Sequence, residues 1–205
     1  GGGLFGFGPI TISITLFLRN VASAGGGSYH GFDKNGRLTN SLFADNQATS
    51  ELGAALLLAS SGTVELTHLT IGTATAQTGS AIALLTGTVP ISNTIVVSHT
   101  VGISQVSGIV SQDYNLFFGN GLYMTGGVID GRISRSGAPD FLQPAADDYR
   151  LNYGSAAVDA GVDVGVKVDF EGEKRPLNNG IDIGYDEINL ADFLPQKLYL
   201  PHLLR

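Results

Sequence analysis

The sequence contains no cysteine and no tryptophan, and only 14% of its 205 residues are charged. Without cysteine, disulfide bonds and thiolate metal sites are excluded. No stretch reaches the roughly 18 consecutive apolar residues that a membrane-spanning helix needs. Eleven Lys and Arg residues stand against eighteen Asp and Glu residues, so the net charge is −7. A nucleic-acid partner is therefore not expected, because phosphate binding requires a basic stripe.

Glycine and strand-forming residues are abundant instead. The chain has 29 glycines, about twice the usual share, and Thr, Val and Ile outnumber helix formers such as Lys and Gln, which favours strands. Charge is distributed unevenly, because only three basic and four acidic residues precede Ser111 and the other eight and fourteen follow. The chain therefore has two compositional regions with a boundary near Ser111.

A loose repeat runs through the first region. Four similar stretches, ISITLFLRN, LTNSLFADN, LTHLTIGTA and ISNTIVVSH, begin at Ile12, Leu38, Leu66 and Ile91, and the step from one to the next is nearly constant. Two further landmarks keep the same step, namely the glycine-led stretches at Gly25, Gly53 and Gly79 and the turn glycines Gly8, Gly62 and Gly87. The stretch SQDYNLFFGN, at residues 111–120, is a shortened fifth copy.

The repeat predicts an all-β solenoid. Apolar and polar residues alternate with period two within each copy, as in half-buried strands. A unit of about 26 residues cannot bury its own apolar face, whereas stacked units can. We therefore expect a right-handed, single-stranded parallel β-helix of about five rungs over residues 1–120. An acidic module over residues 121–190 would cap the open end of the solenoid, and residues 191–205 would form a tail.

Each copy breaks its alternation at one position, which is Asn40, His68 or Asn93, with Ile14 in the first copy. This position marks a bend between two strands of one rung. Stacked polar side chains there can satisfy buried turn backbone along the solenoid axis. His68 could alternatively be a catalytic base or a ligand. We favour the polar turn ladder.

The second region carries a family resemblance. The motifs DYNLF, PDF, DYRL, GSAAVDAG, DFEGEKRP and DIGYDE follow one another in this order. Together they resemble the C-terminal module of the choice-of-anchor Q family, although Ala156 and Val158 replace the usual Pro and Ile. Members are secreted bacterial proteins in which a pectin-lyase-like β-helix precedes this module and an anchoring tail. The resemblance implies an extracellular or cell-surface location and no defined activity.

The two ends of the chain fit this resemblance. The chain opens on GGGLFGFGPITI rather than Met, so we expect a fragment or processed form whose export signal lay upstream. The final stretch, FLPQKLYLPHLLR, is either a short YLP…R terminus of exported proteins or a strand that covers the last rung.

An enzyme of this fold needs clustered carboxylates, or carboxylates with Arg or Lys, on one sheet. In the repeat region no two carboxylates take equivalent, adjacent positions; its charged candidates are Asp33, Asp45, Glu51, Glu65, Arg19 and Arg37. We therefore expect a non-enzymatic stalk, adhesive or glycan-binding scaffold, monomeric, that contacts an extracellular polysaccharide or a surface protein. The alternative is a polysaccharide lyase or glycoside hydrolase whose active rungs lie outside this chain. An uncharged Thr/Ser face would favour the structural or binding role.

Two further groups of residues are candidate sites. Carboxylates on glycine-rich turns suit Ca²⁺, the one cofactor to consider; they are Asp159, Asp163, Asp169, Asp182 and Asp186. Alternatively, these side chains cap turn amides and pair with nearby Arg or Lys. Tyr114, Tyr123 and Tyr149 could form a sugar-stacking platform, or could instead cover the end of the solenoid.

Overall fold

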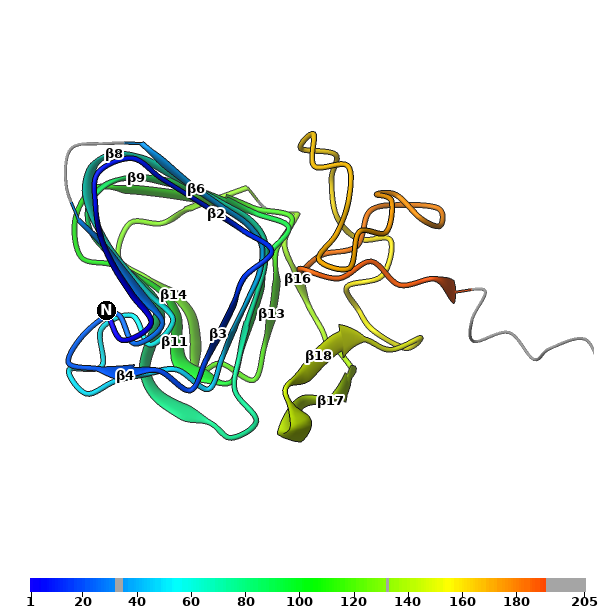
Figure 1. Cartoon of the computed structure of the whole chain (residues 1–205), viewed down its shortest axis with the longest axis horizontal. Coiled ribbons are helices and arrows are strands. Elements are labelled where there is room, and N and C mark those ends of the chain that lie inside the picture. Colours follow the sequence, from blue (N-terminus) through cyan, green and yellow to red (C-terminus); the bar gives the residue numbers. More distant parts are fainter. Residues whose placement is uncertain (32–34, 132, 191–205) are drawn as a thin grey trace, which may run out of the picture.

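A computed structural model describes residues 1–31, 35–131 and 133–190. The chain winds into a right-handed parallel β-helix of about five turns, whose cross-section is roughly triangular (Figure 1). This confirms the fold predicted from the repeat. Within the described residues, no helix combines the length and the apolar character needed to cross a membrane.

Three stacks of parallel strands form the sides of the triangle. The first stack contains β1 (Leu4–Phe7), β5 (Ser28–Gly31), the beginnings of β8 (Leu56–Gly72) and β9 (Gln77–Ser92), β11 (His99–Gln105) and β14 (Leu122–Thr125). The second contains β2 (Ile10–Ser13), the beginning of β6 (Gly36–Ala44), the middle of β8, the end of β9, β12 (Ile109–Asp113) and β15 (Ile129–Asp130). The third contains β3 (Leu16–Leu18), the ends of β6 and β8, β10 (Ile95–Val97), β13 (Leu116–Phe118) and β16 (Arg135–Ser136).

Like side chains stack inside the coil because each rung repeats the previous one. Leu38, Leu66 and Ile91 lie in register on successive strands of the second stack and are all buried. Phe17 and Phe43 stack in the same way in the third, with ring centroids 4.5 Å apart. Burial of such columns is the main favourable contribution to the stability of the solenoid.

At the turn between the first two stacks, Gly87 stands where no other residue fits. Gly87 has φ +100°, and a Cβ at this position would lie 1.8 Å from the Ser60 carbonyl oxygen. Only glycine tolerates both the conformation and the close approach. Gly8, at the corresponding turn of the first rung, also has a positive φ, of +118°, and needs glycine for its conformation alone.

The stacking continues past residue 120, where the repeat was expected to end. β14, β15 and β16 pair with β11, β12 and β13 and add one more level, which reaches Ser136. In the third stack Leu116 pairs with Arg135, and this step along the chain is clearly shorter than the one from Leu42 to its partner Thr70. The shortened step concealed this level in the sequence. The expected tail at residues 191–205 lies outside the described residues.

The C-terminal module, residues 137–190, contains little regular structure. β17 (Phe141–Gln143) and β18 (Asp148–Leu151) form an antiparallel pair around the short 3₁₀ helix η1 (Pro144–Ala146), and loops make up the remainder. The pair β4 (Val21–Ala22) and β7 (Gln47–Ala48) extends one corner of the solenoid.

The module lies beside the solenoid, against the third stack, so the prediction that it caps the open end is wrong (Figure 1). Outward-facing side chains of this stack pack against it and are buried; they are Leu42, Ala44, Ile95, Val97 and Leu116. The strands of this stack carry apolar residues on both faces, as in SLFA and IVV, so their outer surface needs a cover. The module supplies that cover.

Candidate functional site

The bend between the second and third stacks has the same backbone conformation in five successive rungs. Its residues have positive φ angles between 47° and 54°; they are Ile14, Asn40, His68, Asn93 and Tyr114. Asn adopts this left-handed conformation more readily than β-branched or aromatic residues do. We refer to Asn40, His68 and Asn93 as the ladder.

Every ladder side chain holds the module. Asn40 Nδ2 donates to the Val168 carbonyl at 2.7 Å. Asn93 Nδ2 donates to the Val162 carbonyl at 2.7 Å, and its Oδ1 accepts from the Val162 amide at 2.9 Å. His68 Nε2 lies 3.0 Å from Asn93 Nδ2, a donor, so Nε2 accepts and Nδ1–H donates to a module carbonyl, that of Gly184, at 3.2 Å.

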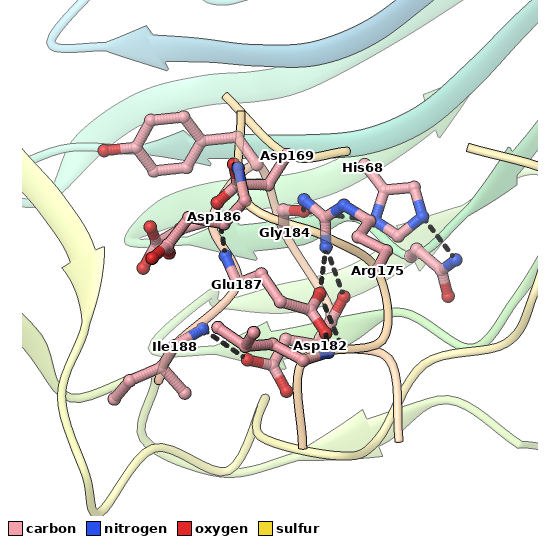
Figure 2. A network of polar contacts seen from close by, with 12 residues as sticks. His68, Asp169, Arg175, Asp182, Gly184, Asp186, Glu187 and Ile188 are labelled. Atoms are coloured by element: carbon pink, nitrogen blue, oxygen red, sulfur yellow. Dashed lines mark hydrogen bonds and ion pairs between the residues drawn. The ribbon is translucent and has the colours of Figure 1, made fainter. Parts of the chain in front are cut away.

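Arg175 joins several of the polar contacts between the ladder and the interior of the module (Figure 2). Its Nη1 donates to Glu187 Oε2 at 2.6 Å, and both side chains are fully buried. Its Nη2 donates to the Gly184 carbonyl at 3.0 Å and to Asn40 Oδ1 at 3.4 Å. Glu187 also accepts from the amides of Leu177 and Asp182. The ion pair therefore joins the ladder to the module interior.

The contact between the third stack with its ladder and the module is called the seam. Burial sets the protonation states of the titratable side chains within it. Burial, with a further contribution from the nearby Arg175 cation, lowers the pKa of His68 to about 3. The imidazole is therefore neutral at physiological pH, as its hydrogen bonds require. A neutral, buried histidine with both ring nitrogens hydrogen-bonded has no free nitrogen for catalysis or for a metal.

The five aspartates considered for Ca²⁺ hold backbone amides. Asp169 accepts from the amides of Glu171, Glu173 and Glu187. The other four behave alike: Asp182 accepts from Asp159 and Ile188, Asp186 from Leu151, Asp159 from Gly180, and Asp163 from Gly165 and also from the Lys167 ammonium. Within the described ranges, no three His, Asp or Glu side chains converge as a metal site. These contacts match the turn-capping alternative.

Two of these carboxyls lie in a strongly desolvated environment. Burial raises the pKa of Asp182 to about 7 and that of Asp186 to about 7. Amide donors oppose the shift in both cases but do not cancel it. Each carboxyl therefore takes up its proton near neutral pH, which makes the module sensitive to pH.

The three tyrosines considered for sugar stacking are not brought together. Tyr149 is buried in the seam beside Leu42 and Tyr185 and presents no face to solvent. Tyr123 is 41% exposed and stacks on Phe117 at the last level of the solenoid. Tyr114 occupies the bend after Asn93.

The outer surface of the second stack, by contrast, carries aligned polar residues. One column contains Ser13, Thr39, Thr67, Ser92 and Asp113, which pair in register from rung to rung. The neighbouring column contains Thr11, Arg37, Glu65, Pro90, Ser111 and Ile129. Arg37 Nε lies 3.4 Å from Glu65 Oε2, and about half of each side chain is exposed. The first column is uncharged over its first four rungs.

Three shallow cavities follow these columns along the solenoid axis, and we call them the groove. Their volumes are about 320, 350 and 340 Å³. Arg37 and Glu65 line both the first and the second, whereas Pro90 and Ser92 line both the second and the third. Val164, from the module, also lines the second. The groove therefore spans several rungs and borders on the module.

The charged residues considered for an enzyme are dispersed. Glu65 pairs with Arg37, Asp45 caps the Ala74 amide, and Arg19 pairs with Asp147 of the module. Glu51 lies at an exposed turn, and Asp33 lies outside the described residues. In the two columns, Glu65 is flanked by Arg37 and Pro90, and Asp113 by Ser92 and Gly131. Within either column, no two carboxylates occupy neighbouring rungs.

Sequence reasoning identified the ladder but missed its partners. Arg175 and Glu187 lie near the other end of the sequence from Asn40, and no periodicity connects them. The module residues Val162 and Val168 contribute backbone atoms, which no sequence motif reveals. Comparisons with known protein families, curated proteins and solved structures give no match for this chain.

Proposed function

We propose that this chain is a pectin-lyase-like β-helix protein, displayed outside a bacterial cell, that binds an extended glycan along the groove without cleaving it. The row of three linked cavities carries the proposal, because an elongated site that repeats with the rungs suits a polymer of repeating units. The module would correspond to that of the choice-of-anchor Q family, on the motifs described above. That correspondence supports the extracellular location.

The chemistry of the groove favours an uncharged glycan. Hydroxyl groups and one Arg–Glu pair line its first two cavities, so their charges balance. Paired charged groups hydrogen-bond well to vicinal hydroxyls, whereas the carboxylates of an acidic sugar would meet Glu65 and, further along, Asp113. No excess positive charge in the described part of the groove offsets that repulsion. We therefore expect neutral chains to bind better than uronic-acid chains.

Calorimetric titration of the full chain with purified hexasaccharides tests this proposal. We expect binding of a neutral β-linked hexasaccharide, such as one of glucose, mannose or xylose, and weaker binding of hexagalacturonate. Glu65→Ala leaves Arg37 unpaired and should shift the preference toward the acidic ligand. Glu51→Ala, which removes the same negative charge at an exposed turn outside the groove, is the matched control. Absence of binding by the unmodified chain would refute the proposal, and release of new reducing ends would instead favour the enzyme.

A further inference from the structure

Residues 162–168 form a module loop that the ladder holds at both ends, and we call it the clasped loop. Asn93 binds both the carbonyl and the amide of Val162, and Asn40 binds the carbonyl of Val168. Asn40 and Asn93 are two rungs apart, which is about 10 Å along the axis. The loop therefore lies along the edge of the second stack rather than away from it.

The clasped loop borders the groove. Val164 lines the middle cavity together with Arg37, Glu65 and Ser92. The polar column is largely covered in the rungs that the loop spans: Thr39 and Thr67 are 8% and 6% exposed and Ser92 is half-buried, whereas Ser13, one rung earlier, is exposed. The neighbouring column, with its exposed Arg37 and Glu65, is left as the floor of the groove.

The loop brings an apolar side chain and no net charge to this border. Asp163 and Lys167 pair with each other at 3.1 Å, and Asp163 also caps the Gly165 amide. Val164 lies between them in the loop. An aliphatic side chain at this place can contact the C–H face of a sugar ring, and it narrows the groove on the side of the module.

We propose that the clasped loop is one wall of the groove, that Val164 is a specificity-determining residue, and that Asn40 and Asn93 are positioning residues. The inference rests on the proposed glycan-binding function and narrows the range of glycans that can bind. The wall admits a linear, uncharged chain and excludes one that carries a branch toward the module. The ladder thus connects the module to ligand selection in the groove.

Two matched substitutions test the wall in the full chain. Val164→Asp places a carboxylate at the wall without touching the ladder, and we expect it to weaken binding of a linear neutral hexasaccharide about tenfold or more. Val106→Asp makes the same change at a residue that is 61% exposed at another corner of the solenoid. We expect that control to leave the affinity within about twofold. Val164→Gly should instead improve binding of a singly branched hexasaccharide.

Asn93→Ala tests the positioning role. We expect faster amide hydrogen exchange of Val162, whose amide loses its acceptor, and a loss of affinity similar to that of Val164→Asp. Exchange in the core strands should not change. Should Asn93→Ala fail to fold, the Val164 and Val106 variants still decide the question.

The outcomes separate the two proposals. If the unmodified chain binds no neutral hexasaccharide, the proposed function fails and the wall fails with it. If it binds, but Val164→Asp and Val106→Asp have equal affinity, the wall alone is refuted. If Val164→Asp weakens binding and Val106→Asp does not, both stand.

Discussion

The solenoid and the module solve the same problem, the satisfaction of buried backbone, by opposite means. In the solenoid, strand amides and carbonyls bond to the next rung, and polar side chains such as Asn46 and Asn115 fill the corners. In the module, aspartate carboxylates accept from amides of irregular loops, as Asp169 does from three. Repeated parallel strands satisfy their backbone groups with few charged side chains, whereas the amides of irregular loops need carboxylate acceptors at particular places. This explains why acidic residues accumulate after Ser111.

The largest expected effect on stability follows from removal of the buried ion pair in the module. Arg175→Ala leaves the Glu187 carboxylate buried without its partner, and we expect a loss of about 3–5 kcal/mol in the free energy of unfolding. Arg150→Ala removes a pair with Asp148 that is partly exposed, and should cost about 1 kcal/mol or less. Urea unfolding followed by circular dichroism measures both. Equal effects would show that burial of the Arg175 pair is unimportant.

A second pair of variants compares one polar anchor in each region. Asp169→Ala leaves three amides without an acceptor, of which that of Glu187 is buried and those of Glu171 and Glu173 are partly buried. We expect a loss of about 3 kcal/mol. Asn46→Ala removes the amide that joins Asn20 to Phe17 in the solenoid, for which about 1–2 kcal/mol is expected. The same urea titration applies. A larger loss for Asn46→Ala would contradict the contrast between the regions.

The two regions should respond oppositely to acid. The pKa of Asp186 is raised to about 7, so the folded state binds a proton that the unfolded state lacks, and stability rises as the pH falls from about 7 toward 4. The pKa of His99, in the solenoid, is lowered to about 4 by burial, so the unfolded state binds the extra proton below about pH 6.5 and stability falls.

Replacing each titratable residue by uncharged Asn isolates its contribution to this pH dependence. Between about pH 7 and pH 5, Asp186→Asn should lose stability on acidification more steeply than the unmodified chain, by about 1 kcal/mol per pH unit. His99→Asn should lose it less steeply, because it no longer titrates. Urea unfolding at three pH values gives the slopes. Parallel slopes for the two variants would contradict this assignment.

The smallest expected effect concerns Ca²⁺. The five candidate aspartates already hold amides or Lys167, so millimolar Ca²⁺ followed by EDTA should leave the midpoint of thermal unfolding unchanged within about 1 °C. Asp163→Asn should behave in the same way. A rise of several degrees with Ca²⁺ would show that the module contains a cation site and would overturn the turn-capping role.

The repeat was sufficient to predict the solenoid, because stacking forces side chains at equivalent positions into register. The ladder position was predictable for the same reason: Asn40, His68 and Asn93 interrupt the alternation at one phase. The side-on module was not predicted, although the doubly apolar runs SLFA and IVV indicated that the outer face of the third stack is covered. The groove wall could not be predicted, since it depends on backbone atoms of Val162 and Val168 that meet the ladder only after folding.

Because the ladder holds the module at three consecutive rungs, the module fixes the number of rungs between Asn40 and Asn93. A whole rung inserted before Gly25 would lengthen the coil and leave these contacts untouched. A rung inserted between Asn40 and Asn93 would draw the anchored ends of the loop apart by about 5 Å. Changes in the length of such a coil are therefore tolerated outside the anchored segment, while that segment itself must keep its rung count.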